Sequence, residues 1–265
     1  MYSPFQLAFK YLHYFFTASN GRGHGIHSPF LFQFITRVLN DKKHDDAYEK
    51  VETLRHQMMK DKTVIPVQDF GAGSIYDKGA GRTICSIAAN SAKSKKYGQL
   101  LYRMVKFYKP GNILELGTSL GITTTYLAMA NPGAKVITLE GANAVASVAK
   151  KNLELFKITN VDLIEGNFED TLAPVISRMS FVEFAFIDGN HRREPTERYF
   201  QQILPKITHN TILVFDDIHW SSEMEKAWDV IQKHPSVQCS VDLFFMGIIF
   251  FQDVFREKQH FRIRF

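Results

Sequence analysis

The segment at 112–128, NILELGTSLGITTTYLA, constrains the fold more than any other part of this 265-residue chain. An apolar strand pattern leads into Gly117, and a helical pattern begins after Gly121. Glycines in such a turn let backbone N–H groups at the start of a helix come close to a polar ligand. The segment therefore predicts a strand, a glycine turn and a helix that together hold a cofactor.

The spacing of the glycines argues against a dinucleotide. A dinucleotide-binding turn reads Gly-x-Gly-x-x-Gly, and its middle glycine admits the pyrophosphate. Here Thr118 and Ser119 follow Gly117, so the middle glycine is missing. The next strand, 135–139, leads into Glu140, and a carboxylate at this point of such a sheet accepts hydrogen bonds from ribose hydroxyls. The pattern indicates a nucleoside cofactor without a pyrophosphate.

Glu115, the two glycines and Glu140 together resemble two features of class I S-adenosylmethionine-dependent methyltransferases. These features are the first motif, Glu-x-Gly-x-x-x-Gly, and the acidic end of the second strand. The resemblance implies S-adenosylmethionine as the cofactor. It also implies a set of cofactor-binding residues: Glu115, Gly117, Thr118, Ser119, Gly121, Glu140 and Gly141. The alternative is an ordinary strand-turn-helix whose glycines serve only the turn.

From Gly111 onward the sequence alternates strand and helix patterns, as in a doubly wound parallel sheet. Strands are predicted at 112–117, 135–140, 161–165, 181–187 and 211–216. Helices are predicted at 121–130, 143–156, 194–204 and 222–233. Adjacent strands at 237–243 and 248–251 resemble the antiparallel pair that closes this sheet in the family. The predicted fold class is α/β: a Rossmann-like class I methyltransferase sheet of five parallel strands plus a C-terminal antiparallel pair, with a helical N-terminal extension.

The front of the chain predicts helices, at 3–17, 29–40, 45–60 and 97–108. We therefore divide the chain into a helical N-terminal extension or lid, 1–108, and an S-adenosylmethionine-binding methyltransferase domain, 109–265. The resemblance implies that such an extension covers the cofactor or shapes the substrate pocket. Two glycine-rich loops, 20–25 and 71–81, separate the helices, and we expect His24 and Arg82 to reach a substrate from them.

The sequence DFGAGS at 69–74 imitates the first motif. Pro66 interrupts the apolar run before it, and the residues that follow, IYDKGAGR, make a poor helix. The motif also lacks a strand that ends in an acid about 20 residues later. We interpret this segment as a loop over the substrate rather than as the cofactor turn.

Composition argues for a globular protein in a reducing compartment. Hydrophobic residues make up 45% of the chain, which is enough for a buried core. Cys85 and Cys239 lie far apart and suggest neither a disulfide framework nor a zinc site, so we expect a cytoplasmic protein. The aromatic segment 1–16 is interrupted by Lys10 and His13 and resembles neither a signal peptide nor a membrane span. We expect it to pack against the body; an interfacial membrane helix is the alternative.

Positive charge is concentrated in the front of the chain. Residues 1–111 hold 17 Lys and Arg against 8 Asp and Glu, a net charge of +9, while residues 112–265 hold 15 against 19, a net charge of −4. Such a surface can attract an anionic substrate or nucleic acid. The basic residues are scattered and form no recognisable nucleic-acid module, so we favour a solvated face over a nucleic-acid partner.

Two further segments carry the resemblance to small-molecule O-methyltransferases related to catechol O-methyltransferase. The sequence KYGQLL at 96–101 resembles the helix that lies over the methionine end of the cofactor in that family, which implies a cofactor contact at Gly98. The loop after the third strand contains Asn167 and Phe168. The resemblance implies that Asn167 hydrogen-bonds the adenine and that Phe168 forms an apolar wall beside it.

Three acids stand at the ends of two later strands, where open α/β sheets bind their ligands. Asp188 ends FVEFAFID, and Asp216 and Asp217 end TILVFDD. Carboxylates in this arrangement suit Mg²⁺, which prefers oxygen ligands. Metal-dependent O-methyltransferases carry Asp and then Asp-Asn at these positions, so Asp217 departs from the pattern and adds charge. A metal-free alternative lets Asp188 orient the substrate or cofactor while the other two acids cap the next helix.

The general base is not where the resemblance puts it. Sugar O-methyltransferases with a similar acid trio carry an acid two residues beyond the first Asp, and this chain has Asn190 there. His191 and His219 directly follow the acidic strand ends, and imidazole titrates near neutral pH. We therefore expect Asp188, His191 and His219 to be the catalytic residues. Surface-loop positions without a catalytic role are the alternative for the two histidines.

The sequence as a whole predicts an S-adenosylmethionine-dependent methyltransferase that acts on a hydroxyl oxygen of a small acceptor and uses a divalent metal such as Mg²⁺. An Asn-Pro-Pro-Tyr type motif for amino-group methylation is absent after the fourth strand, where the sequence is DGNH at 188–191. Two alternatives stay open. One is an RNA- or protein-directed methyltransferase that uses the basic N-terminal region, and the other is a non-catalytic interaction module. Self-association into a homodimer is also left open.

Overall fold

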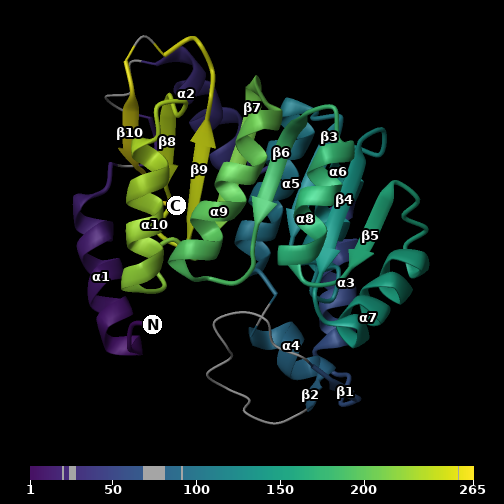
Figure 1. The fold of residues 1–265 in the computed structure, drawn as a ribbon. Coiled ribbons are helices and arrows are strands. Elements are labelled where there is room, and N and C mark those ends of the chain that lie inside the picture. Colours follow the sequence, from purple (N-terminus) through teal and green to yellow (C-terminus); the bar gives the residue numbers. More distant parts are fainter. Residues whose placement is uncertain (20, 24–27, 68–80, 91, 256) are drawn as a thin grey trace. The chain divides into compact units, whose positions relative to one another are not determined.

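The computed structural model describes residues 1–19, 21–23, 28–67, 81–90, 92–255 and 257–265 (Figure 1). The chain forms two compact units. The first unit consists of residues 1–41 and 178–265, and the second unit consists of residues 42–177. The segment DFGAGS at 69–74, the residue His24 and most of the loops 20–25 and 71–81 lie outside the described residues.

The second unit contains three parallel strands in the order β3, β4, β5. These are β3 (Asn112–Leu116), β4 (Lys135–Glu140) and β5 (Val161–Glu165), and they match the prediction closely. The last four residues of β3 are buried, as expected for a parallel strand covered on both faces. Helices α6 (Ile122–Ala130), α7 (Asn143–Leu155) and α8 (Phe168–Arg178) follow the three strands in turn.

The front of the second unit is helical with one small hairpin. Helices α3 (Asp46–Met58) and α5 (Lys95–Tyr108) confirm two predicted helices. Strands β1 (Val64–Pro66) and β2 (Gly81–Thr83) pair antiparallel, and α4 (Ile84–Asn90) follows; none of these three was predicted. Buried residues of α3, α4, α5 and α6 share one apolar cluster, so the helices pack on the cofactor-turn helix α6.

The first unit has a mixed sheet in the order β10, β8, β9, β7, β6. Strands β6 (Val182–Ile187) and β7 (Ile207–Asp216) run parallel. Strand β9 (Met246–Phe250) lies antiparallel between β7 and β8 (Cys239–Asp242), which confirms the predicted C-terminal pair. The short strand β10 (Gln259–Arg262) was not predicted and lies parallel to β8.

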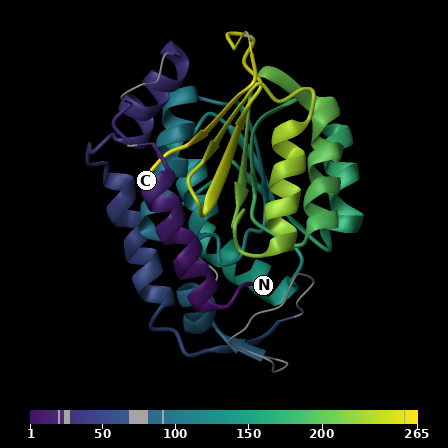
Figure 2. The same ribbon diagram turned by 90° about the vertical axis from the view of Figure 1, so that its left-hand side faces the viewer.

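Helices cover both faces of this mixed sheet. Helices α9 (Arg193–Ile203) and α10 (Ser222–Lys233) lie on one face, and α1 (Pro4–Thr17) lies on the other (Figure 2). Helix α2 (Pro29–Phe34) begins at Pro29 as predicted and continues as a π-helical turn, Ile35–Leu39. Together α1, α2 and this turn confirm the predicted helices at 3–17 and 29–40. Among the described helices, none combines the length and hydropathy needed to cross a bilayer.

Candidate functional site

The glycine turn after β3 has the backbone conformation that glycine permits. Gly117 has a φ of 102° and Gly121 a φ of 78°, both in the range that residues with a Cβ rarely adopt. A Cβ at Gly121 would also lie 3.3 Å from the Cβ of Ala149 on α7. The N–H groups of Gly117 and Thr118 donate to the carbonyl oxygen of Leu139, at 3.0 and 3.2 Å. The turn is therefore fixed to the end of β4.

Glu140 joins the ends of these two strands. Its Oε2 accepts a hydrogen bond from the Ser119 N–H at 2.8 Å, and its Oε1 accepts one from the Ala142 N–H at 2.9 Å. Burial raises the pKa of Glu140, and these backbone donors oppose the rise. A carboxylate oxygen has two lone pairs, so each oxygen can accept one more hydrogen bond. The geometry fits a pair of ribose hydroxyls.

Glu115 is fully buried beside the same turn. Its Oε2 accepts hydrogen bonds from the hydroxyls of Thr124 and Thr138, at 2.5 and 2.6 Å. Its Oε1 has no hydrogen-bond partner within the described residues. Burial raises the pKa of Glu115 to about 7, although the two hydroxyls favour the charged form. An unmatched buried acceptor is costly, so this oxygen suits a donor brought by a ligand, such as an amino group.

The other predicted cofactor residues lie around the same strand ends or on α5. A Cβ at Gly98 would lie 2.7 Å from the Tyr126 ring, so close packing of α5 on α6 already requires glycine there. Gly141 directly follows Glu140 and is half-buried. Asn167 accepts a hydrogen bond from the Glu169 N–H at 3.2 Å, and half-buried Phe168 begins α8. Their contacts with a cofactor remain predictions.

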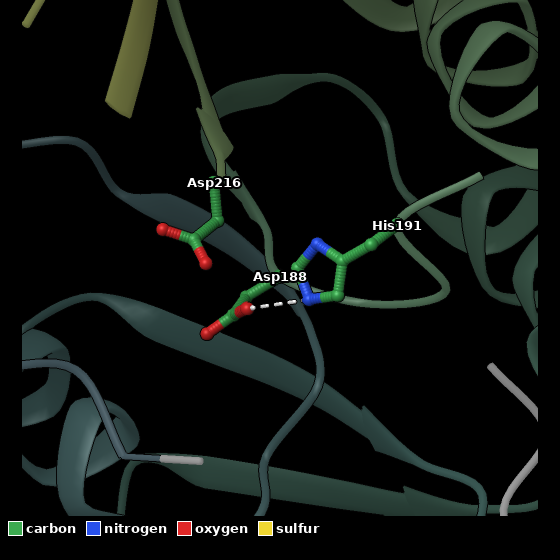
Figure 3. Close-up of side chains that lie close together, drawn as sticks. All are labelled: Asp188, His191 and Asp216. Atoms are coloured by element: carbon green, nitrogen blue, oxygen red, sulfur yellow. Dashed lines mark ion pairs between the residues drawn. The ribbon is translucent and has the colours of Figure 1, made fainter. Parts of the chain in front are cut away.

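A separate group of side chains lies at the strand ends of the first unit. One ligand atom from each of Asp188, His191 and Asp216 lies within 4.8 Å of the other two (Figure 3). Nε2 of His191 is 3.5 Å from Oδ1 of Asp188. Asp216 is buried, and the other two side chains are partly exposed. The parallel pairing of β6 and β7 brings the two acids together, as their positions in the sequence predict.

The backbone at these strand ends is left-handed at three residues that are not glycine. Asn190, His191 and Asp217 have φ values of 70°, 40° and 51°. Such conformations cost free energy and cluster at functional sites. Nδ2 of Asn190 donates to the Tyr199 hydroxyl at 3.3 Å, while its buried Oδ1 lacks a partner in the part of the chain that the structure describes. Asn190 therefore offers an acceptor next to His191.

The two carboxylates of this group fit a divalent cation, and the imidazole of His191 beside them offers either a third ligand or a proton acceptor. Carboxylate oxygens suit Mg²⁺ and Mn²⁺, and an imidazole nitrogen shifts the preference toward transition metals. Asp217 does not belong to this group of three. Its role as a metal ligand remains a prediction.

His219 lies in a different cluster. Its Nδ1 is 3.0 Å from Oε1 of Glu225, and its Nε2 is 2.9 Å from Oδ2 of Asp242. Burial lowers the pKa of His219, but the hydrogen bonds and charges of Asp242 and Glu225 outweigh it and raise the pKa. Glu225 also bonds Tyr2 and Lys10 of the N-terminal segment. These contacts favour a structural role for His219, and its role as a base remains a prediction.

Sequence reasoning did not find these partners of His219 or the two threonines that hold Glu115. Lys10 and Glu225 are 215 positions apart, so no local pattern connects them. The threonines are closer, because Thr124 and Thr138 lie in the helix and strand that follow the glycine turn. A polar residue in an otherwise buried strand, such as Thr138 in β4, is the signal that indicates a buried acceptor nearby.

Comparison with known proteins places this geometry in a family. A family model described as a methyltransferase domain matches residues 114–218. A catechol O-methyltransferase of Niastella koreensis is 30% identical over 162 residues, which are 60% of this chain and 68% of that protein. The human transmembrane O-methyltransferase is 40% identical over 78 residues, which are 28% of this chain and 27% of that protein.

Solved structures show the same fold. An O-methyltransferase from Bacillus cereus in complex with SAH has a TM-score of 0.56 and 20% identity, over 84% of this chain and 98% of that one. An SAH-bound methyltransferase of Podospora anserina has a TM-score of 0.60 and 16% identity, over 85% and 97%. The predicted Rossmann-like fold class is confirmed, with β10 as an added strand. The chain belongs to the class I S-adenosylmethionine-dependent O-methyltransferases.

Proposed function

We propose that this methyltransferase transfers the methyl group of S-adenosylmethionine to a hydroxyl oxygen of a small acceptor held by a divalent metal. The observation that carries the proposal is the convergence of Asp188, His191 and Asp216 within 4.8 Å at the ends of neighbouring strands. The relative in Niastella koreensis is named a catechol O-methyltransferase, which supports a catechol or another vicinal diol as the acceptor.

In this proposal, different residues bind the cofactor and the acceptor. The turn at Gly117 lets the cofactor come close to the backbone, Glu140 accepts from the ribose hydroxyls, and Glu115 offers Oε1 to the amino group. The cofactor supplies an electrophilic methyl group. Asp188 and Asp216 would hold a metal, whose charge lowers the pKa of a bound hydroxyl.

We assign to His191 the role of the general base that accepts the proton of the acceptor hydroxyl. Asn190 has no basic atom, whereas the imidazole of His191 is partly exposed and lies beside the two acids. Oδ1 of Asn190 would accept a hydrogen bond from a second acceptor hydroxyl. Asp217 remains our proposal for a further metal ligand, because it directly follows Asp216.

We also propose that residues 1–108 act as an extension that shapes access for the acceptor to the domain at 109–265.

Cys85 and Cys239 are free thiols, which supports a reducing cytoplasm as the place of the reaction.

The test is methyl transfer to catechol and to a panel of vicinal diols, with Mg²⁺ or Mn²⁺ and with EDTA. Transfer that depends on the metal is the expected result, and transfer that EDTA leaves undiminished would exclude the metal role. His191→Asn should lower kcat by about a hundredfold, with Mn²⁺ affinity unchanged. Loss of Mn²⁺ affinity in this variant would instead make His191 a ligand. His209→Asn, an exposed histidine in β7, is the matched control.

A further inference from the structure

Helix α1 turns a row of large apolar side chains toward solvent. Phe5, Phe9, Leu12 and Phe16 are 90%, 74%, 53% and 79% exposed. Their spacing of four, three and four residues places them along one side of the helix. We call these four residues the α1 outer face. Exposed apolar residues scattered singly are ordinary, but a contiguous row of this kind marks an interaction surface.

The opposite side of α1 already holds the helix on the first unit. The Tyr11 ring lies 5.1 Å from the Phe244 ring and 5.8 Å from the Phe245 ring, measured between centroids. The Tyr14 hydroxyl donates to the carbonyl of Ile263, and Lys10 pairs with Glu225 at 3.0 Å. The attachment of α1 therefore does not use the outer face, and those four side chains are available to a partner.

The segments that form and contact α1 are rich in cations. Two of these cations lie beside acids, since Lys10 pairs with Glu225 and Nε of Arg262 lies 3.7 Å from Oδ2 of Asp242. Residues 1–40 contain Lys10, Arg22 and Arg37 but no Asp or Glu. Residues 259–265 contain Arg262 and Arg264 and likewise no acid. The two segments meet where the Arg264 N–H donates to the carbonyl of Ser19 at 3.0 Å, and the Arg264 guanidinium lies 5.3 Å from the centre of the Phe15 ring on α1.

This charge distribution favours a membrane over a second copy of the chain as the partner of the α1 outer face. In an isologous dimer the same patch meets itself, so two copies joined through α1 would bring together two surfaces on which cations outnumber acids. A membrane with anionic lipids offers the complementary charge, and aromatic side chains suit the boundary between headgroups and acyl chains. At 14 residues, α1 has the length of a helix that lies in the interface plane.

We propose that the α1 outer face docks this protein on membrane surfaces that contain anionic phospholipid. The phenylalanines enter the headgroup boundary, and the arginines lie near lipid phosphates. The proposal concerns the first unit alone and does not depend on the methyl acceptor or on the metal.

The experiment is co-sedimentation with vesicles of phosphatidylcholine alone and of phosphatidylcholine mixed with phosphatidylglycerol. The wild type should pellet with the anionic vesicles and stay in the supernatant with the neutral ones. Replacing two side chains of the α1 outer face, Phe9→Ser with Phe16→Ser, should weaken binding to anionic vesicles by about tenfold or more. Arg264→Gln should weaken binding to anionic vesicles less than the double serine variant does. Added salt should reduce the difference in binding between the wild type and Arg264→Gln, and also the difference between anionic and neutral vesicles.

The matched control is Leu155→Ser, which removes a side chain that is 63% exposed at the end of α7. It should bind vesicles like the wild type, and all variants should keep the melting temperature and the affinity for S-adenosylmethionine. Equal binding by the double serine variant, or no binding by the wild type, overturns the proposal. The wild type could instead form a dimer that the double serine variant converts to a monomer, with no vesicle binding by either protein. That result assigns the α1 outer face to a second copy of the chain and also overturns the proposal.

Discussion

At the residue scale, our proposal for cofactor binding depends on single carboxylates, and Glu140 is the clearest case. Its two oxygens accept from the N–H groups of Ser119 and Ala142, so the side chain orders both loops, and we propose that it also accepts from the ribose hydroxyls. Hydrogen bonds to charged groups contribute about 1.5–3 kcal/mol each. We expect Glu140→Ala to weaken S-adenosylmethionine binding by roughly a hundredfold, measured by calorimetry.

The chain supplies a matched control for this substitution. Glu165 pairs in register with Glu140 across β4 and β5 and forms an ion pair with Lys150 on the surface. Glu165→Ala removes an acid at the same level of the sheet, and cofactor affinity should not change. Equal affinity in the wild type and in Glu140→Ala would remove the basis for placing the ribose at this residue.

Glu115 leads to a prediction about stability and pH. Burial raises its pKa from 4.5 to about 7, so its stabilising contribution is complete below pH 4.5 and is lost as the pH rises through 7. Glu115→Gln keeps the shape but cannot ionise. Its stability relative to the wild type should therefore rise between pH 4.5 and pH 8 by roughly 3 kcal/mol, measured by urea unfolding. A difference that is constant over this range would show that Glu115 ionises in the fold as it does in water.

At the element scale, the His219 cluster determines how α1 is attached. Glu225 contacts His219, Tyr2 and Lys10, so one carboxylate connects the start of α10 to the N-terminal segment. Burial raises the pKa of Glu225, but its hydrogen bonds from Tyr2, Lys10 and His219 outweigh this and lower it, whereas the pKa of His219 is raised. The cluster is therefore strongest when the acid is charged and the imidazole is protonated.

The pH dependence follows from these directions. The contribution of His219 is fully present below its ordinary pKa of 6.5 and is lost as the pH rises through its raised value. The contribution of Glu225 is present above 4.5 and is lost as the pH falls through its lowered value. We expect His219→Gln to cost roughly 2 kcal/mol at pH 5.5 and clearly less at pH 9, measured by denaturant unfolding. A cost that does not depend on pH would contradict a charged imidazole.

The elements that could be predicted from the sequence are those with strong local patterns. The strands of the core read as continuous apolar runs, and their ends at Glu140, Asp188 and Asp216 follow from those runs. Helix α8 escaped prediction because Pro174 lies in its interior and reads as a break. Strand β10 has four residues that alternate in burial, and among the described strands it pairs with β8 alone, so its existence depends on a distant partner.

At the scale of the whole molecule, a short sequence motif indicates the family, whereas no short motif indicates the methyl acceptor. The residues that we propose for the cofactor between Glu115 and Glu140 lie in two consecutive strands and in the turn and helix between them, so a short stretch of sequence brings them together. The backbone strain at Asn190 and the partners of His219 depend on tertiary contacts instead. Chemistry that rests on such contacts could not be derived from the order of residues.

Apart from Asp188, which is a candidate for both sites, the residues proposed for the cofactor lie at 98–168 and those proposed for the metal lie at 188–217. Asp216→Asn should therefore abolish Mn²⁺ binding and lower methyl transfer by about a hundredfold or more, because a buried ligand charge is lost. The same variant should bind S-adenosylmethionine like the wild type, whereas Glu140→Ala should bind Mn²⁺ like the wild type. Calorimetry with each ligand separates the two effects. If Asp216→Asn keeps the affinity for Mn²⁺, the metal does not bind at Asp216. Measuring Mn²⁺ binding by Asp217→Asn then shows whether the neighbouring acid holds the metal.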